Sequence, residues 1–513
     1  MPFPTSALHR SSMILSPNRS EVIAAANAGQ RTLVWTKLVS DLETPVSAML
    51  KLQQEGAQAF LLESVEGGET RGRYSILGLE PDLMWRCMGN KPELSTTPPF
   101  LEESFAPAWD DSLSSLRKLV AEHRMELPEA LPPMAAGLIG YMGYDMVKLM
   151  ERLPDTKPDT IGIPDACFLR PRLLLIFDAV HGVVYLIAPI WETGGDAGAH
   201  YDAAAARIRR IARQLQGPID QRHYYKEGAT ETNETPRSFT SNLTLAEYGN
   251  MVAAAKDYIG AGDIFQVVLS QRFEAAFDLP PLALYRALRH LNPSPFLFYL
   301  NFGNYALVGS SPEILVRLRD ETVTIRPIAG TRPRGKTSAE DAALAEELLA
   351  DPKERAEHLM LLDLGRNDVG RVAERGAVRV TEQMIIEHYS HVMHIVSNVE
   401  GTIAPGKDAI DALVAGFPAG TVSGAPKIRA MEIIDELEPV RRSFYAGCVG
   451  YFSANGTMDT CITLRTALVK DGKIYAQAGG GIVADSDPEA EYQESVNKAK
   501  AVLRAATLAG RFA

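Results

Sequence analysis

The stretch from Tyr445 to Lys500 constrains the fold of this chain more than any other part of the sequence. It contains the run CITLRTALV, which predicts a strand with Arg465 inside it, and then the turn KDG and a hairpin partner, KIYAQA. Gly479, Gly480 and Gly481 follow and predict a short bend without side chains, where backbone N–H groups can approach a ligand closely. This stretch therefore predicts a hairpin that brings the exposed backbone N–H groups of the glycines near the positive charge of Arg465.

A helix is predicted directly after these glycines. Asp487 is a favoured N-cap residue, and Pro488 fits the first helical position. On this helix Glu491, Glu494 and Lys498 are three and four residues apart, so they share one face. Taken singly, a hairpin, a loop and a solvated helix are the commoner interpretation. Their coincidence in one stretch favours a pocket for a small anion, with carboxylates that can also hold a metal ion.

The overall charge and the cysteines restrict the class of protein. The formal net charge is −12 and no run of Lys or Arg occurs, which argues against a nucleic-acid partner. No apolar run approaches the roughly 18 residues of a membrane span, and the N-terminus does not resemble a signal peptide. The four cysteines form no CxxC pair. We therefore expect a cytoplasmic protein with reduced thiols and no membrane partner.

The length of 513 residues predicts two domains or one large composite unit. Residues 1–30 are polar and weakly patterned, which predicts a flexible lead-in. We expect an N-terminal domain over residues 31–216, a polar linker over residues 217–242 and a second domain over residues 243–513. Strand-rich runs alternate with helices without regular βαβ units, so the fold class is expected to be α+β.

Two further side chains are candidates for chemistry. Glu357 lies on a helix predicted after Pro352, where a carboxylate most often extends to water. If it faces Glu494 instead, the two supply the sparse carboxylate set that Mg²⁺ prefers, with waters and substrate oxygens completing the coordination. His394 lies in the run VMHIVSNV, whose alternation predicts a strand. It is either a proton carrier beside a pocket or a structural residue of the strand.

Several long motifs occur in one order: SPEILVR, RPIAGTRPRG, EHLMLLDLGRNDVGRV, VMHIVSNVEG, FPAGTVSGAPKIRAMEII and QAGGGIVADSDPEAEYQESVNKAKAVLRA. Together with LLES at residues 61–64 and NPSPF at residues 292–296, they resemble the chorismate-utilising enzymes. Within that family they are most similar to the large, ammonia-using subunits of anthranilate synthase. The resemblance covers most of the chain after the lead-in. It implies large antiparallel sheets packed as a sandwich with helices outside.

The resemblance also implies roles for individual residues. It implies that Glu357 and Glu494 bind Mg²⁺, which holds the ring carboxylate of chorismate. It implies that Glu313 protonates the departing 4-hydroxyl group and that His394 lies close to the reacting ring, because hydroxide is a poor leaving group. The expected substrate-binding residues are Gly330, Thr331, Tyr445, Arg465, Gly479, Gly480, Gly481 and Lys498.

Two positions distinguish the branches of this family. Related aminodeoxychorismate synthases typically carry a nucleophilic lysine where this chain has Ala329. Isochorismate and salicylate synthases carry a lysine that activates water where this chain has Gln266. Because both lysines are missing, the nucleophile must be brought in. The reaction implied is addition of ammonia at C2 of chorismate, loss of the 4-hydroxyl group and elimination of pyruvate to give an aromatic amine.

The ammonia implies a partner. The resemblance implies a glutamine amidotransferase subunit, whose activity needs a nucleophilic cysteine on a tight turn. None of the four cysteines here lies in a Gly-x-Cys-x-Gly context, and the chain is short for a second domain of that kind. We therefore expect the amidotransferase to be a separate subunit, in a heterotetramer with two copies of each chain.

The resemblance finally implies a tryptophan inhibitor site, which would be formed by Glu63, Ser64, Pro295, Phe296 and Leu297. The alternative for either segment alone is a structural hairpin or a rigid loop. Other functions that stay open are another chorismate enzyme, such as an aminodeoxychorismate or isochorismate synthase, and a non-catalytic binder of tryptophan. The combination of acid, metal-binding and anion-binding residues argues against a mere binder.

Overall fold

The computed structural model describes residues 13–54, 56–64, 72–109, 111–220, 238–389 and 392–513. Its helices are α1 (Arg19–Asn27), α2 (Pro45–Leu52), α3 (Ser112–Glu122), α4 (Ala197–Leu215), α5 (Leu245–Ala261), α6 (Pro281–Leu291), α7 (Ser338–Ala350), α8 (Pro352–Gly370), α9 (Ala409–Gly416), α10 (Lys427–Leu437) and α11 (Pro488–Leu508). Among its short 3₁₀ turns are η2 (Tyr144–Leu149) and η5 (Gly420–Val422).

The strands of the first half are β1 (Thr32–Val39), β2 (Ala59–Glu63), β3 (Tyr74–Met88), β4 (Lys91–Ser95), β5 (Ala106–Pro107), β6 (Gly137–Met142), β7 (Ala166–Asp178) and β8 (Val183–Ile190). Those of the second half are β9 (Thr240–Ser241), β10 (Gln266–Ala276), β11 (Phe296–Asn301), β12 (Tyr305–Ser311), β13 (Ile314–Arg319), β14 (Thr322–Ile325), β15 (Ile328–Pro333), β16 (Arg379–His388), β17 (Val392–Thr402), β18 (Gly424–Ala425), β19 (Cys448–Ser453), β20 (Met458–Ile462), β21 (Thr466–Lys470) and β22 (Lys473–Ile482).

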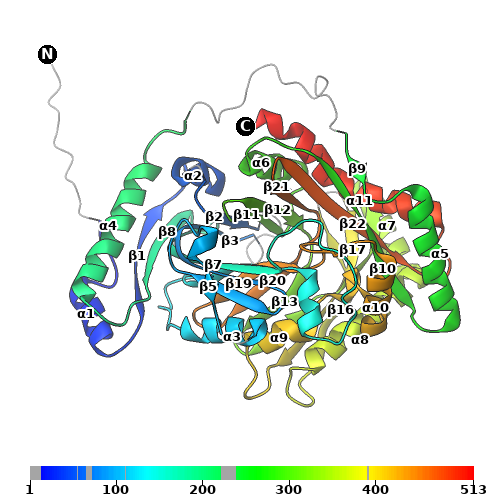
Figure 1. Cartoon of the computed structure of the whole chain (residues 1–513), viewed down its shortest axis with the longest axis horizontal. Coiled ribbons are helices and arrows are strands. Elements are labelled where there is room, and N and C mark those ends of the chain that lie inside the picture. The colour runs from blue at the N-terminus through cyan, green and yellow to red at the C-terminus, as the bar shows by residue number, and fades with distance from the viewer. Residues whose placement is uncertain (1–12, 55, 65–71, 110, 221–237, 390–391) are drawn as a thin grey trace.

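The strands form a sandwich, as the alternation of side chains along β7 shows. Leu173 and Leu175 belong to a hydrophobic cluster that packs against α4, α6 and α11. Leu174 and Ile176 belong to a second cluster, which fills the space between this layer and strands β6, β19 and β20. A third cluster lies on the far side of those strands, against α3, α5, α9 and α10. The expected α+β fold, a sandwich with helices outside, is confirmed (Figure 1).

Strands from the two halves of the chain are interleaved in the sheets. β2 pairs with β11, so that Glu63 lies opposite Leu297, and β6 pairs with β19, so that Met142 lies opposite Cys448. All the strand pairs of the described residues are antiparallel (for example β3 with β7 and β10 with β22). The boundary expected around residues 217–242 therefore does not separate two independent sheets. Most of that linker, residues 221–237, lies outside the described residues.

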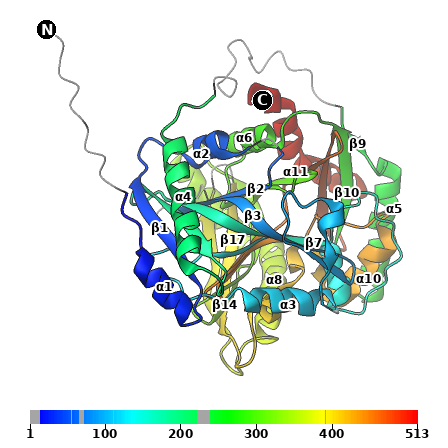
Figure 2. The same ribbon diagram turned by 60° about the vertical axis from the view of Figure 1, so that its left-hand side comes forward.

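Part of the expected flexible lead-in is regular structure. Asn18 caps α1 by accepting hydrogen bonds from the backbone N–H groups of Ser20 and Glu21, and the Glu21 side chain accepts from the N–H of Asn18 at 2.7 Å. The helix packs beside α4 at one end of the molecule, where the turned view shows both next to β1 (Figure 2). The helix was missed because its buried face is narrow, with Val22 as its buried residue. None of the helices in the described ranges has the length and apolarity of a membrane span.

Candidate active site

The three consecutive glycines form part of a strand, and the prediction of a bend there is wrong. Gly479, Gly480 and Gly481 lie in β22 and pair with Ser270, Leu269 and Val268 of β10. Their lack of side chains makes room for neighbouring groups instead of a turn. A Cβ atom added to Gly480 would lie 2.8 Å from Glu491 Oε2 and 3.7 Å from Glu494 Oε1. Strand β22 therefore has no side chains where it faces the carboxylates of α11.

Helix α11 begins as expected, because the Asp487 side chain accepts a hydrogen bond from the N–H of Ala490. Lys498 Nζ lies 2.7 Å from Glu494 Oε1 and donates to the carbonyl oxygen of Gly479 at 3.1 Å. The Glu491 carboxylate accepts from Ser486 Oγ at 2.6 Å, while its other oxygen is buried without a hydrogen-bond partner. The shared helix face thus carries the Lys498 ammonium group, which is held by Glu494 and Gly479, and one oxygen of Glu491 that can still accept a hydrogen bond or bind a cation.

Glu357 approaches this group from helix α8. Its Oε1 accepts a hydrogen bond of 3.2 Å from Gln266 Nε2. Burial raises the pKa of the Glu357 carboxyl, the Gln266 hydrogen bond opposes this, and the charges of Glu354 and Glu494 add to the rise. Burial and the neighbouring Glu494 charge also raise the pKa of Glu491. Carboxylates from α8 and α11 therefore interact across the glycine strand.

This donor set fits Mg²⁺ better than a metal held by protein ligands alone. Within the described ranges, no group of three or more His, Cys, Asp or Glu residues is arranged to hold a metal ion. Mg²⁺ commonly takes one or two carboxylates and completes its octahedron with water and substrate oxygens. The mutual repulsion of Glu357 and Glu494 and the unpartnered oxygen of Glu491 are the features that a bound cation would relieve.

His394 lies in β17, as expected from its alternation. Its Nδ1 is 2.9 Å from the carbonyl oxygen of Gly330 and 3.1 Å from Thr331 Oγ1, on the paired strand β15. A carbonyl oxygen only accepts, so Nδ1 carries the proton and Nε2 of the neutral ring keeps its lone pair. Burial lowers the pKa of His394, the Gly330 bond opposes this, and the charge of Arg465 adds to the lowering. His394, Gly330, Thr331 and Arg465 thus form one neighbourhood.

Glu313 lies in the short connection between β12 and β13 and is buried. Its Oε1 accepts a hydrogen bond of 3.0 Å from Thr421 Oγ1, which belongs to the turn η5. Burial raises the pKa of Glu313 to about 8, although the Thr421 hydrogen bond opposes the rise. A small cavity adjoins it and is also lined by Asp368 and by Leu361 and Leu364 of α8. The carboxyl group therefore carries a proton near neutral pH.

Arg465 does not lie inside a strand, which corrects the prediction for CITLRTALV. That run forms two strands, β20 and β21, and Arg465 lies between them with φ at +49°. Its carbonyl oxygen accepts from the N–H of Ser310 at 3.2 Å, which fixes the bend. Tyr445 is buried nearby in sequence, and burial raises its pKa to about 12. The hairpin of β21 and β22, with Lys470 opposite Lys473, is confirmed.

The two segments of the expected inhibitor site lie side by side. Leu297 pairs with Glu63 across β11 and β2, which places Phe296, Pro295 and Ser64 at the same end of this strand pair. The Glu63 carboxylate is buried and already engaged. It accepts hydrogen bonds from Tyr285 Oη and from Arg289 Nε, the latter at 2.8 Å. An arriving ammonium group would therefore share this carboxylate with Arg289.

Three residues that contact the expected site, Gln266, Thr421 and Glu354, were not identified as such in the sequence, and Glu491 was identified only as a carboxylate on the shared helix face. Gln266 was treated only as a position without lysine, and Thr421 only as part of the motif FPAGTVSGAPKIRAMEII. Glu354 approaches the site beside Gly330, where an added Cβ would lie 3.1 Å from its Oε2. Glu491 shares a helical face with Glu494, and this spacing was the available signal. The partners of the other three lie far away in the sequence.

Comparisons with known proteins identify the family of this chain. A family model described as chorismate binding enzyme matches residues 62–504. The chain therefore belongs to this family of chorismate-utilising enzymes.

Within the family the chain is similar to the proteins named anthranilate synthase component 1. The one from Cereibacter sphaeroides is 58% identical over 95% of this chain and 96% of its own length, and the one from Thermus thermophilus is 47% identical over 92% and 97%. The crystal structure of anthranilate synthase component I from Streptococcus pneumoniae TIGR4 is 36% identical, with a TM-score of 0.74 over 91% of this chain and 99% of that one.

Proposed function

We propose that this chain converts chorismate and ammonia to anthranilate and pyruvate. The observation that carries the proposal is that one chain holds a buried acid, Glu313, whose raised pKa keeps it protonated near neutral pH, and a neutral histidine, His394, that lies against Gly330 and Thr331. Hydroxide leaves the chorismate ring poorly unless it is protonated, and Glu313 holds the needed proton near neutral pH. The relatives named anthranilate synthase component 1 support the choice of reaction.

Glu313 and His394 can carry out the proton transfers that the reaction needs. As ammonia bonds to C2, the 4-hydroxyl group leaves as water with the proton of Glu313. The added nitrogen then releases one proton. Aromatisation removes the hydrogen at C2 as a proton while the enolpyruvyl group leaves as the enolate of pyruvate, which takes up one proton at its methylene carbon to give pyruvate. The free lone pair on His394 Nε2 is suited to accept a proton in this second stage, because Nδ1 is held by the Gly330 carbonyl group.

The substrate carboxylates have separate partners. Arg465 and the amides of the strand containing Gly479, Gly480 and Gly481 would hold one carboxylate, with Tyr445, Gly330 and Thr331 forming the rest of the pocket. Lys498 would act through Glu494 and the Gly479 carbonyl group, to which it is already bound. Glu357 and Glu494 would hold Mg²⁺, which when bound neutralises and orients the ring carboxylate.

The nucleophile is ammonia delivered by another subunit. Ala329 is buried and has no reactive side chain, and Gln266 donates its amide to Glu357, so neither position supplies an amine. The four cysteines are free and buried, and burial raises the pKa of Cys87, Cys167 and Cys448 to about 12. A glutaminase thiol needs a lowered pKa instead. We therefore propose a glutamine amidotransferase partner, in a heterotetramer with two copies of each subunit, and a cytoplasmic location.

We also propose that tryptophan inhibits the enzyme at the strand pair β2 and β11. Glu63, Ser64, Pro295, Phe296 and Leu297 would form this site, with Arg289 sharing the charge of Glu63. The supporting observation is that two segments more than 200 residues apart meet as hydrogen-bonded neighbours. Tryptophan would act by binding a low-activity arrangement of the same sheets more tightly than the active one.

The purified chain with chorismate, Mg²⁺ and ammonium chloride tests the reaction, with anthranilate followed by its fluorescence. Formation of anthranilate with ammonium but not with glutamine is the expected result. Glu313→Gln should remove it, while Glu346→Gln, an exposed change on α7, should not. Release of another product, or none, from the folded wild-type chain would contradict the proposal.

A further inference from the structure

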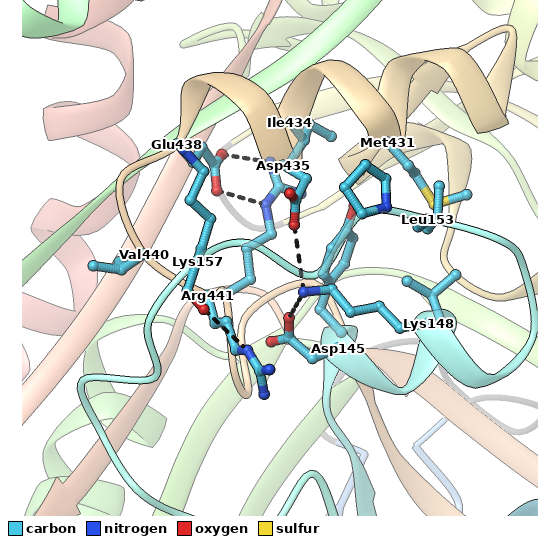
Figure 3. Close-up of a pocket in the computed structure, with 14 residues that line it drawn as sticks. Asp145, Lys148, Leu153, Lys157, Met431, Ile434, Asp435, Glu438, Val440 and Arg441 are labelled. Atoms are coloured by element: carbon cyan, nitrogen blue, oxygen red, sulfur yellow. Dashed lines mark hydrogen bonds and ion pairs between the residues drawn. The ribbon is translucent and has the colours of Figure 1, made fainter. Parts of the chain in front are cut away.

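Arg442 is a buried charge that the proposed reaction does not use directly. Its side chain is 1% exposed, and it lies between α10 and β19. Its Nε and Nη2 donate to the two oxygens of Glu438 at 2.9 and 2.6 Å. Figure 3 labels Glu438 and draws these two hydrogen bonds as dashed lines. A buried ion pair of this kind is often no more stabilising than apolar residues of the same size. Its presence therefore calls for a role beyond stability.

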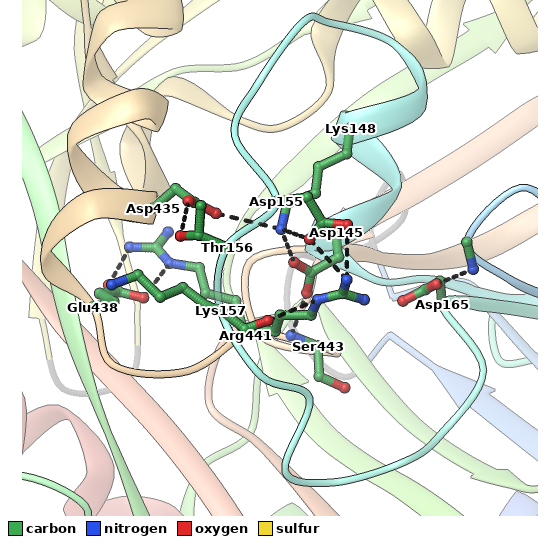
Figure 4. Close-up of polar contacts among 12 residues, drawn as sticks. Asp145, Lys148, Asp155, Thr156, Lys157, Asp165, Asp435, Glu438, Arg441 and Ser443 are labelled. Carbon is green, nitrogen blue, oxygen red and sulfur yellow. Dashed lines mark hydrogen bonds and ion pairs between the residues drawn. The ribbon is translucent and has the colours of Figure 1, made fainter.

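The neighbouring charges lie on the outer side of the pair and satisfy one another. Lys148 Nζ lies 3.4 Å from Asp145 and 3.3 Å from Asp435, and Arg441 Nη2 lies 2.7 Å from Asp155 (Figure 4). These contacts fasten the segment after η2 to the end of α10. The contacts of Arg442 run in the other direction, toward the centre of the sandwich.

One inward contact of Arg442 leads to the acid. Its Nη1 donates to the carbonyl oxygen of Val422 at 2.7 Å. Val422 ends the turn η5, in which the preceding residue is Thr421, the hydrogen-bond donor to Glu313. The next residue, Ser423, accepts from the N–H of Val268 at 2.9 Å. The turn that holds the acid is therefore fastened on both sides of Val422.

The other inward contacts lead to the glycine strand. Arg442 Nη2 donates to the carbonyl oxygen of Val268 at 2.6 Å. Glu438 Oε1 accepts from the N–H and the Oγ of Ser270, both at 2.8 Å. Val268 and Ser270 lie opposite Gly481 and Gly479 in the pairing of β10 with β22. The ion pair thus holds the strand behind the expected substrate-binding glycines.

Two aromatic rings fix the guanidinium group between these contacts. It lies 4.8 Å from the ring centre of Tyr144 and 5.5 Å from that of Tyr445. Tyr445 belongs to the expected substrate pocket, and its N–H also donates to the carbonyl oxygen of Arg442 at 3.2 Å. One planar side chain therefore contacts the acid-holding turn, the glycine-backing strand and a pocket tyrosine.

We propose that Arg442, held by Glu438, is a positioning residue that sets the place of Glu313 relative to the substrate-binding strand. This inference rests on the proposed function, because the acid role of Glu313 belongs to it. Arginine is needed since its five donors lie in one plane, whereas a lysine ammonium cannot reach two carbonyl groups and both carboxylate oxygens together.

The test compares Arg442→Lys with Arg170→Lys in the ammonia-dependent assay. Arg170 is a matched control, because it pairs with Asp82 at 2.7 Å and lies over the ring of Trp191, away from η5. For Arg442→Lys we expect kcat to fall about 10- to 100-fold, the cost of a displaced catalytic group, with KM for chorismate changed less than about threefold. Arg170→Lys should keep both constants.

The pH dependence of kcat distinguishes a positioning role of Arg442 from a general disturbance of the structure. Glu313 acts only while protonated, so kcat falls as pH rises through its pKa, which is about 8. The Thr421 hydrogen bond favours the charged form, so losing it should move this fall to higher pH. The other ionisable group lining the adjoining cavity is Asp368, paired with Lys427 at 2.7 Å, and neither is changed. Arg442→Lys and Thr421→Val should each move the alkaline limb of the kcat profile to higher pH by the same amount. The double variant should move this limb no further than either single variant.

The outcomes are distinct. A wild-type chain that makes no anthranilate overturns the proposed function, whereas an active wild type with an unshifted limb in folded Arg442→Lys overturns the positioning role. Additive shifts in the double variant also overturn it. If Arg442→Lys does not fold, Glu438→Gln takes its place, because the amide keeps an acceptor for Ser270 and weakens the grip on Arg442. A wild-type profile in folded Glu438→Gln would then contradict the inference.

Discussion

His394 and Gly330 are joined by a contact of 2.9 Å between imidazole Nδ1 and a backbone carbonyl oxygen. The contact fixes the tautomer of the ring, and a left-handed conformation at Gly330, with φ at +69°, aims the carbonyl group at it. The bulge between Ala329 and Thr331 in β15 is the backbone feature that permits this. The chemistry of His394 is therefore set by its neighbour strand.

The first prediction concerns the acid limb of the pH profile. Burial lowers the pKa of His394, so the ring stays neutral until the pH falls below its ordinary value of 6.5. We expect kcat of the wild type to be retained at pH 6.5 and to fall only under more acidic conditions. His394→Gln should remove both this limb and most of the activity. His388→Gln changes a histidine at the end of the adjoining strand and serves as the control, so loss of the limb in that variant would refute the assignment.

The second prediction concerns the effect of Glu313 on the stability of the folded protein as the pH changes. The folded carboxyl group keeps its proton up to a pH of about 8, whereas the unfolded chain releases it near the ordinary value of 4.5. Its contribution to the free energy of unfolding is therefore complete below 4.5 and is lost as the pH rises through 8. Glu313→Gln should gain in Tm relative to the wild type between pH 5 and pH 8.5, measured by calorimetry. A constant difference in Tm across this range would contradict the raised pKa.

The third prediction concerns Mg²⁺. Glu357→Gln and Glu494→Gln should each abolish ammonia-dependent activity and weaken Mg²⁺ binding measured by calorimetric titration, because each removes a charge that water cannot replace. Glu489→Gln, an exposed change in the first turn of α11, should alter neither. Full activity of either site variant in the presence of EDTA would exclude the metal assignment.

The fourth prediction concerns Arg465. Arg465→Ala should lower kcat/KM by about 10- to 100-fold, since a carboxylate would lose a charge-assisted hydrogen bond worth about 1.5–3 kcal/mol. The loss should be smaller for a chorismate analogue that lacks one carboxylate. Arg366→Ala, an exposed arginine paired with Asp363 on α8, is the control. Unchanged kinetics in Arg465→Ala would exclude Arg465 as a ligand of a substrate carboxylate.

The fifth prediction concerns tryptophan. Ser64→Phe should fill the space beside Glu63 and Leu297, leaving turnover intact and removing inhibition. Because coupling between two sites is reciprocal, wild-type affinity for tryptophan should fall when chorismate and Mg²⁺ are present. Calorimetric titration with and without chorismate measures this. Equal affinities, or a Ser64→Phe enzyme as inhibitable as the wild type, would exclude this site.

The sequence predicted features that depend on neighbouring residues. The hairpin around Asp471, the capped start of α11 at Asp487 and the strand containing His394 follow from alternation, turn residues and capping preferences, and all are present. The resemblance supplied the sandwich and the pairing of residues into one site. Local patterns could not have provided either, because the strands concerned pair across long separations.

The errors have a common physical cause. Gly479 to Gly481 predicted a bend because glycine favours turns, but pairing with β10 extends them, and that partner lies about two hundred residues earlier. Arg465 was placed inside a strand because the run around it is apolar, whereas its left-handed backbone ends one strand and begins another. Thr421 and Glu313 are 108 residues apart, so no spacing rule predicts their hydrogen bond. In each case a tertiary contact overrides local preference.

The interleaving of β2 with β11 and of β6 with β19 has a consequence for how this enzyme can change over evolutionary time. A recombination event that joined residues 31–216 of one relative to residues 243–513 of another would have to preserve strand register at two seams at once. A mismatch of one residue would turn core side chains toward the wrong layer. The proposed tryptophan site takes residues from both halves and therefore cannot be exchanged as a module. It must be gained or lost by substitutions within a lineage that keeps both halves together.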